Sequence, residues 1–205
     1  MCPLAHIFFQ LLLSVSLPNV AYETLVHLSE EEIADFVIEW AKKYHQDVFD
    51  VLQSQKDDFV KLLGIGRDGK KPRKDLINAE QILQFTKYFF DAWFVQEDPM
   101  LEQIPADEAV AILNDYLATY NHADDNSAWF DKIRTITEQR GYAVRPKDYK
   151  KNPEAYKGHV GDVSTVIRLA ITGRRNSPDI WSIQQILGKD KTIARVEKYI
   201  DELLK

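Results

Sequence analysis

The apolar residues between Val163 and Ile171 constrain most strongly what this chain can fold into. They recur at three- and four-residue steps, which is the spacing of one face of a helix. Gly173 follows at the position where a helix end favours a left-handed residue, and Arg174 and Arg175 are expected to project from the turn. Pro178 fits the first turn of a second helix, because its missing N–H costs nothing there. The stretch therefore predicts a corner between two core helices.

Helical spacing recurs along the chain, and no segment sustains the alternation typical of a strand. Ser29 and Glu32 form a capping-box pattern before the first apolar stripe. We predict an all-α fold of two consecutive helical bundles, with an apolar segment at 1–22, one bundle at 23–100 and one at 101–205. In the first bundle, helices are expected after Ser29, over 45–53, over 56–63 and along an aromatic stretch from Ile82 to Trp93 that ends near Asp98. In the second bundle, helices are expected to begin at Pro105, at Asn126 or Ser127, near Gly161, at Pro178 and near Asp190. Residues 145–157 are expected to be an extended connection.

The N-terminal residues 1–20 contain an apolar run that is too short to span a bilayer. No lysine or arginine precedes that run, which disfavours a secretory signal. We expect the segment to pack against something, as a remnant of a preceding domain. The single cysteine, Cys2, excludes an intramolecular disulfide and fits a reducing compartment, so we expect a cytoplasmic protein.

The charge of the chain is unevenly distributed. The net charge is −6, yet residues 61–75 carry a local +4 and residues 140–175 a local +6. Such segregation favours a basic face that meets a polyanion. The alternative is that both lysine-rich segments are simply solvated.

No motif indicates catalysis, a metal site or a bound cofactor. Residues 64–69 have the letters of a GxGxxG fingerprint, but no βαβ unit surrounds them. The five histidines lack metal-site spacing, and no serine or cysteine has an evident histidine partner. The basic loop that continues through Lys71, Pro72, Arg73 and Lys74 is better suited to a phosphate backbone.

Several motifs, in order, resemble the C-terminal anticodon-binding region of bacterial glutamyl-tRNA synthetases. The pattern Arg168-Leu-Ala-Ile-Thr-Gly173, then Ser177-Pro178, then Ile186-Leu-Gly-Lys-Asp190 is similar to the family signature. Trp129-Phe130 with Gly141, the basic loop 64–75 and the cluster 88–91 are also similar, so that the resemblance covers about residues 17–205. It implies a helical cage around an anticodon whose bases are splayed and read by side chains.

The catalytic motifs of that family, similar to H-I-G-H and K-M-S-K-S, do not occur in this sequence. The resemblance therefore implies tRNA binding without catalysis by this chain alone, with ATP and Mg²⁺ belonging to a catalytic domain that is absent. The expected partners are tRNA-Glu, or tRNA-Gln, and a catalytic fragment. The alternatives are a non-catalytic half that assembles with a separate catalytic chain, or a helical interaction protein that binds no RNA. The expected tRNA-binding residues are Arg67, Lys71, Arg73, Lys74, Arg168, Arg174 and Arg175.

Overall fold

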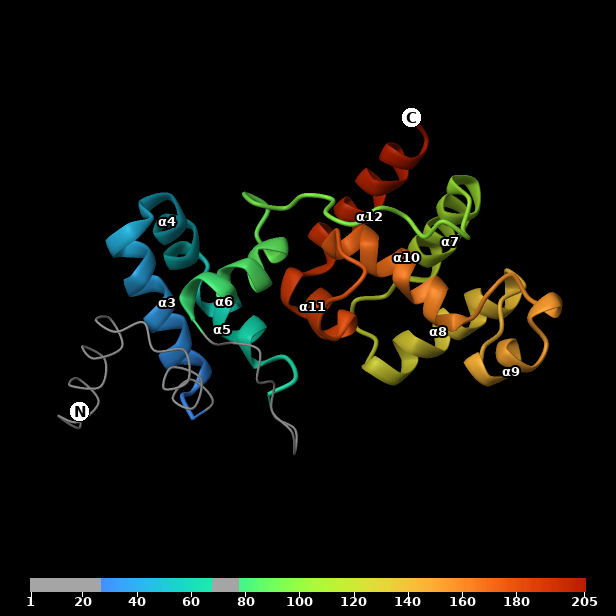
Figure 1. Ribbon diagram of the computed structural model, residues 1–205, viewed down its shortest axis with the longest axis horizontal. Coiled ribbons are helices and arrows are strands. Elements are labelled where there is room, and N and C mark those ends of the chain that lie inside the picture. The colour runs from blue at the N-terminus through green and yellow to red at the C-terminus, as the bar shows by residue number, and fades with distance from the viewer. Residues whose placement is uncertain (1–26, 68–77) are drawn as a thin grey trace. The chain divides into compact units, whose positions relative to one another are not determined.

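The computed structural model describes residues 27–67 and 78–205, and the chain divides into two compact units after Lys87. Within those ranges every regular element is a helix, and the β pairing is confined to one isolated bridge between Ala143 and His159 (Figure 1). The all-α prediction is confirmed. The apolar segment 1–22 lies outside the described residues, as do Lys71, Arg73 and Lys74 of the basic loop.

The first unit is organised around its longest described helix, α3, which packs against the other three. The predicted capping box is confirmed: the Ser29 hydroxyl accepts from the Glu32 N–H, and the Glu32 carboxylate accepts from the Ser29 N–H at 2.8 Å. The helices are α3 (Glu30–Tyr44), α4 (Gln46–Ser54), α5 (Lys56–Gly64) and α6 (Ala79–Thr86). The fully buried side chains include Ile33, Val37, Leu52, Phe59 and Ile82.

The aromatic helix is shorter than the sequence predicts. α6 ends at Thr86 and is followed by a single 3-10 turn, η1 (Lys87–Phe89). The carbonyls of Tyr88 and Phe89 accept hydrogen bonds from the Arg195 guanidinium of the second unit, so they are not used to extend the i to i+4 hydrogen bonds of an α-helix. The compact units consequently divide after Lys87, whereas the sequence placed the division near residue 100.

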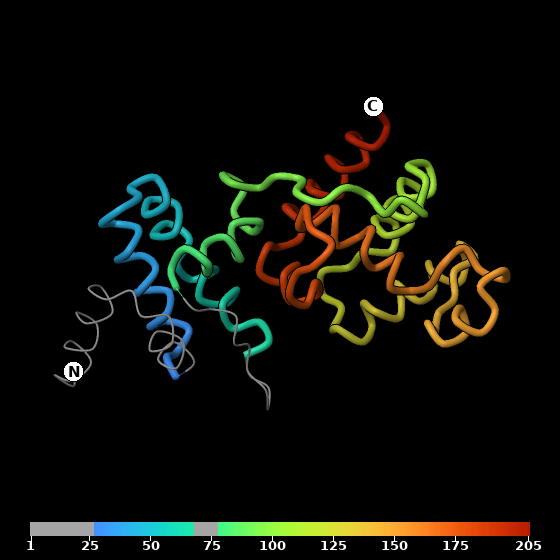
Figure 2. The backbone as a smooth tube through the Cα atoms, in the orientation of Figure 1, coloured from blue at the N-terminus to red at the C-terminus, as the bar shows by residue number. Residues whose placement is uncertain are grey.

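The second unit is built around α10, which packs against α7, α8 and α12 (Figure 2). The apolar stripe that predicts this helix, from Val163 to Ile171, is buried as expected. The elements of the unit are α7 (Ala106–Thr119), α8 (Asn126–Gln139), α9 (Pro146–Lys151), η2 (Pro153–Ala155), α10 (Val160–Thr172), α11 (Ile180–Leu187) and α12 (Lys189–Leu203).

Three local expectations in the second unit are wrong. Asp125, rather than Asn126 or Ser127, caps α8 by accepting from the Ala128 N–H. Pro178 lies before the helix, because the Asp179 carboxylate caps α11. The 145–157 segment is not extended, because Pro146 occupies the first helical position, where its fixed φ starts the short helix α9.

Candidate nucleic-acid interface

The turn between α10 and α11 joins two of the predicted tRNA-binding arginines to a third on α10. We call Arg168 together with residues 173–178 the arginine corner. Gly173 ends α10 with φ 69°, as its sequence position predicts, and its N–H donates to the Leu169 carbonyl at 2.8 Å. Its own carbonyl accepts from the N–H groups of Glu97 and Asp98 at 2.9 and 3.0 Å. The corner is therefore fastened to the chain that precedes α7.

Arg174 is held against that same preceding segment. Its Nε and Nη2 donate to the two carboxylate oxygens of Glu97 at 2.7 and 2.8 Å, which is a bidentate pair. The guanidinium also lies 5.3 Å from the ring centroid of Tyr88. Only 14% of the Arg174 side chain is exposed, so it does not project from the turn as the sequence suggested.

Arg175 is exposed at the surface, but its polar atoms are also used within the protein. Its backbone N–H donates to Asp98 at 2.7 Å, and its guanidinium donates to the carbonyls of Pro99 and Met100 at 2.9 and 2.7 Å. Arg174 and Arg175 together fix residues 97–100 against the corner. Their role in RNA contact stays a prediction.

Arg168 differs from Arg174 and Arg175 in that its Nε–Nη2 edge is not engaged by any described residue. Its Nη1 donates to the carbonyls of Ser177 and Pro178, both at 3.0 Å, and to the Ser177 hydroxyl at 2.6 Å. Among the described residues, its Nε and Nη2 have no hydrogen-bond acceptor. Burial lowers the pKa of Arg168, and the nearby Asp179 carboxylate acts in the opposite direction. The side chain is half-buried, so its Nε–Nη2 edge is oriented by the Nη1 contacts.

In the first unit, Arg67 marks the start of the basic loop. Its side chain is only 7% exposed, with Nε donating to Glu30 at 2.9 Å and Nη2 to the Leu28 carbonyl at 2.8 Å. A backbone hydrogen bond and this pairing hold the pKa of Glu30 below its usual value, although burial acts to raise it. Arg67 therefore joins the end of the described segment 27–67 to the start of α3. The other three predicted residues of the loop, Lys71, Arg73 and Lys74, lie outside the described residues.

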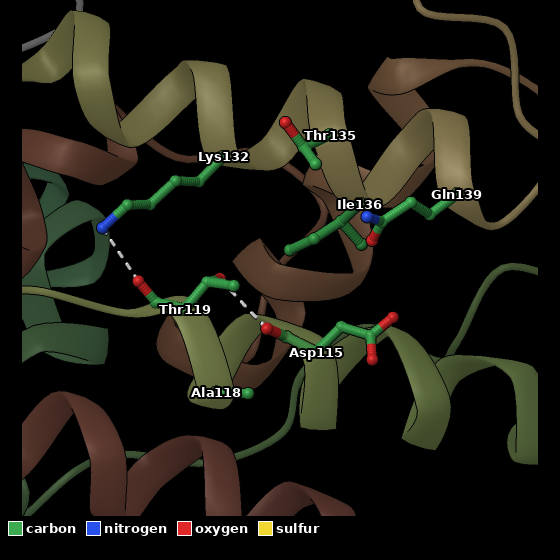
Figure 3. A pocket seen from close by; sticks show the side chains of 7 residues that line it. All are labelled: Asp115, Ala118, Thr119, Lys132, Thr135, Ile136 and Gln139. Atoms are coloured by element: carbon green, nitrogen blue, oxygen red, sulfur yellow. Dashed lines mark hydrogen bonds between the residues drawn. The ribbon is translucent and has the colours of Figure 1, made fainter.

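One shallow pocket lies between α7 and α8 in the second unit, and Figure 3 shows its lining. Its volume is about 190 Å³, below the range typical of small-molecule sites. Its two charged residues already have partners: Lys132 donates to Asp124, and Asp115 accepts from Arg140 at 2.6 Å. Nor do the described residues group three His, Cys, Asp or Glu side chains in a way that could hold a metal ion. We assign no ligand to this pocket.

Arg195 was not among the residues predicted from the sequence, and it is 6% exposed in the core of the second unit. Its Nη1 donates to the carbonyls of Tyr88 and Ile171, and its Nη2 donates to the Phe89 carbonyl and to Asp91. The guanidinium also stacks 4.3 Å from the Phe94 ring centroid. A basic residue at core spacing on α12, one step before Val196, is the signal that could have found it.

Comparison with known proteins identifies the region that contains the arginine corner. Residues 149–200 match the anticodon binding domain family. The chain is 50% identical over 184 residues to the glutamate–tRNA ligase of Acetivibrio thermocellus, an alignment that covers 90% of this chain and 34% of that protein. It is 33% identical over 190 residues to the glutamate–tRNA ligase of Clostridium perfringens strain SM101, covering 91% of this chain and 34% of that protein.

The ligase of Sorangium cellulosum is 32% identical over 188 residues, which cover 91% of this chain and 33% of that protein. The chain thus spans about a third of the length of the curated relatives it matches. None of its described helices is long and apolar enough to cross a bilayer. The resemblance of this chain to the anticodon-binding region of the bacterial glutamate–tRNA ligases is confirmed.

Proposed function

We propose that this chain binds tRNA at the anticodon, as the recognition part of a glutamate–tRNA ligase. The observation that carries the proposal is the match of residues 149–200 to the anticodon binding domain family, within a chain that is similar to glutamate–tRNA ligases over 90% of its length. The expected ligand is tRNA-Glu, or tRNA-Gln, and this function would place the chain in the cytoplasm. Single-stranded anticodon bases are recognised by stacking and by hydrogen bonds to their edges.

Within the second unit, we assign base contact to Arg168 in preference to Arg174 and Arg175. A guanidinium reads a base or a phosphate best with two parallel N–H groups. Arg168 keeps such an edge, since only Nη1 is engaged, by Ser177 and Pro178. Arg174 uses the corresponding edge on Glu97. Arg174 and Arg175 then shape the corner, and Arg67 positions the loop from which Lys71, Arg73 and Lys74 would reach the RNA.

A tRNA-binding experiment with the full chain tests this proposal. A filter-binding titration with a tRNA-Glu transcript should give an affinity that falls with salt, by about 0.7 to 0.9 log units per log unit of salt for each phosphate contact. Arg168→Ala should weaken binding about 5- to 100-fold, which corresponds to the loss of one arginine–base contact. Arg168→Lys keeps the charge and should recover only part of that loss, because lysine lacks the planar fork.

Arg134→Ala is the matched control, because Arg134 lies on α8 of the same unit, is 51% exposed and, among the described residues, contacts only Asp131 and the Phe130 ring of its own helix. It should leave the affinity within about twofold, since exposed ion pairs contribute little. Thermal unfolding of each variant separates lost contacts from lost folding. Binding that ignores salt, or equal losses in the Arg168 and Arg134 variants, would contradict the proposal. A chain that shifts no tRNA in a gel would support the helical interaction protein instead.

We further propose that the chain does not activate glutamate by itself and contributes to ligation only together with a catalytic part. The sequence contains neither the H-I-G-H-like nor the K-M-S-K-S-like motif, and this supports the proposal. The purified chain should show no glutamate-dependent exchange of pyrophosphate into ATP. Addition of a catalytic fragment of a related ligase should restore aminoacylation of tRNA-Glu. Exchange by the pure chain would overturn this proposal and leave tRNA binding standing.

A further inference from the structure

Three lysines of α9 are exposed and have no acidic partner. Lys147, Lys150 and Lys151 make no ion pair or hydrogen bond with any residue that the structure describes, and all three are exposed. Most other described cations, by contrast, contact a carboxylate, a carbonyl or an aromatic ring, as Lys132, Arg140 and Lys157 do. The charge of these three lysines is therefore available to a partner.

The spacing of the three lysines places them on one side of the helix. Positions i, i+3 and i+4 of an α-helix are neighbours on one face, and Lys147, Lys150 and Lys151 have this spacing. Asp148, the acidic residue within the helix, accepts instead from Arg145 at 2.9 Å. We call the face that carries the three lysines the lysine face. It concentrates three positive charges on a single surface.

The segment that carries the lysine face is fastened at both ends. The Ala143 N–H donates to the Gly158 carbonyl at 2.9 Å, and the Val160 N–H donates back to the Ala143 carbonyl at 2.9 Å. The Tyr149 ring of α9 also lies 5.7 Å from the ring of His159, the residue that caps α10, in an edge-to-face arrangement. Because the helix is held in this way, ordering it on binding costs little conformational entropy.

We propose that the lysine face is a second RNA contact, one that binds phosphates without reading sequence. It rests on the proposed tRNA-binding function, and it adds a surface that lies at the other end of α10 from the arginine corner (Figure 1). α10 has 13 residues and is about 20 Å long, from the rise of an α-helix. One RNA that contacts the corner therefore has to extend along α10 to reach α9.

Charge and position favour RNA over another anionic partner. Lysines act as point charges toward phosphate and carry no base information, which suits a contact that positions the backbone. Lys150 and Lys151 lie within residues 149–200, the segment that matches the anticodon binding domain family. The segment 145–157, which contains α9, carries five basic and two acidic residues, so its net charge is +3 in a chain whose net charge is −6. A phosphate backbone is the partner that complements such a local excess.

The test removes the three charges together, in the variant Lys147→Ala/Lys150→Ala/Lys151→Ala. Its control is Lys189→Ala/Lys198→Ala/Lys205→Ala, which changes the net charge equally at exposed positions along and after α12. With a tRNA-Glu transcript, the α9 variant should bind about 10- to 100-fold more weakly near physiological salt, and its salt slope should fall by about 2. The control should retain the affinity and the slope of the unmodified chain.

A second probe, poly(rU), separates this inference from the anticodon proposal because it contains no anticodon. If the α9 variant loses affinity for both RNAs, the lysine face is supported. If tRNA binding is absent while poly(rU) binding depends on the three lysines, the inference holds and the anticodon proposal fails. If tRNA binds equally well to the α9 variant and the control, the inference is overturned and the anticodon proposal stands. A chain that binds neither RNA overturns both.

Two direct readouts complete the experiment. RNA should protect Lys147, Lys150 and Lys151 from acetylation by an activated acetate ester, read by mass spectrometry, while Lys189 and Lys205 remain reactive. Equal protection at both sets would count against the lysine face.

Vesicles containing phosphatidylglycerol serve as the membrane probe. If vesicles bind through the three lysines and RNA does not, the partner is a lipid surface and the RNA assignment is wrong.

Discussion

Replacement of Gly173 by alanine should destabilise the second unit far more than the loss of a glycine cap alone. An added Cβ would lie 2.2 Å from the Val95 carbonyl oxygen and 3.3 Å from the Gln96 Cα, and both are backbone atoms. Since the side chain cannot turn away from them, the chain at 95–98 must move. That movement breaks the hydrogen bonds from Glu97 and Asp98 to the Gly173 carbonyl.

The expected loss in the free energy of unfolding is the sum of three contributions. The left-handed conformation of a residue with a Cβ costs about 1 to 2 kcal/mol. Displacement of the packed backbone adds about 1 to 3 kcal/mol, and each lost hydrogen bond adds about 1 kcal/mol. We therefore expect Gly173→Ala to lower the free energy of unfolding by about 4 to 7 kcal/mol, a large part of the stability of a small domain.

Gly141 provides the matched control. It ends α8 with φ 80°, and the Tyr142 N–H donates to the Thr137 carbonyl, as in a Schellman cap. An added Cβ there would meet only the flexible end of Lys157, at 4.0 Å. Gly141→Ala should therefore lose only the conformational contribution, about 1 to 2 kcal/mol.

Urea unfolding followed by tryptophan fluorescence measures the difference between the two variants. With a slope of about 2 kcal/mol per molar urea, the midpoint of Gly173→Ala should lie at least about 1 M below that of Gly141→Ala. Equal midpoints would refute the argument that the close approach of the 95–98 segment, and not the left-handed conformation, makes glycine necessary at position 173.

Two further predictions concern buried groups in the second unit. Arg195→Met should lower the free energy of unfolding by about 3 to 5 kcal/mol, because it leaves three buried carbonyls without their donor, whereas Asp91 keeps its ion pair with Lys191; a loss below about 1 kcal/mol in urea unfolding would show that Arg195 does not hold the 88–91 segment. Burial, with Glu108 and Asp162 nearby, raises the pKa of Tyr142 to about 12. Since an unfolded tyrosine ionises near about pH 10, the contribution of Tyr142 to stability should be complete below that pH and lost as pH rises from about 10 to about 12. Tyr142→Phe should flatten this fall in urea unfolding at pH 9, 10 and 11, and an unchanged pH dependence would contradict the assignment.

Local chemistry made most of the helices predictable from the sequence. The Ser29–Glu32 box, the stripe at 163–171 and the glycine at 173 each act within a few residues, so their signals lie together in the chain. The errors occurred where local signals compete. Asp125 and Asp179 are alternative caps beside the residues chosen, and Pro146 starts a helix in a stretch otherwise read as extended.

The candidate site was predictable only in part. The sequence alone placed Arg174 and Arg175 at one turn, included Arg168 among the expected tRNA-binding residues, and showed the resemblance to glutamyl-tRNA synthetases through its motifs. It could not assign their side chains, because the acceptors for Arg174 and Arg175 lie 75 to 77 residues away in the chain. It also counted Lys147, Lys150 and Lys151 within a basic stretch without resolving that they share a helix face.

The sequence by itself determined the helical class, most of the helices and the resemblance to glutamate–tRNA ligases, because these depend on residue types at short, fixed spacings. Only the tertiary structure decided which cations are available to a ligand. The acceptors that engage Arg195 lie 24 to 107 residues away in the chain, and no pattern within α12 specifies them. A long cationic side chain contacts whatever the fold places within its reach. Folding brings Glu97 to Arg174 and Tyr88 to Arg195, and it leaves the three lysines of α9 without an acidic partner among the described residues.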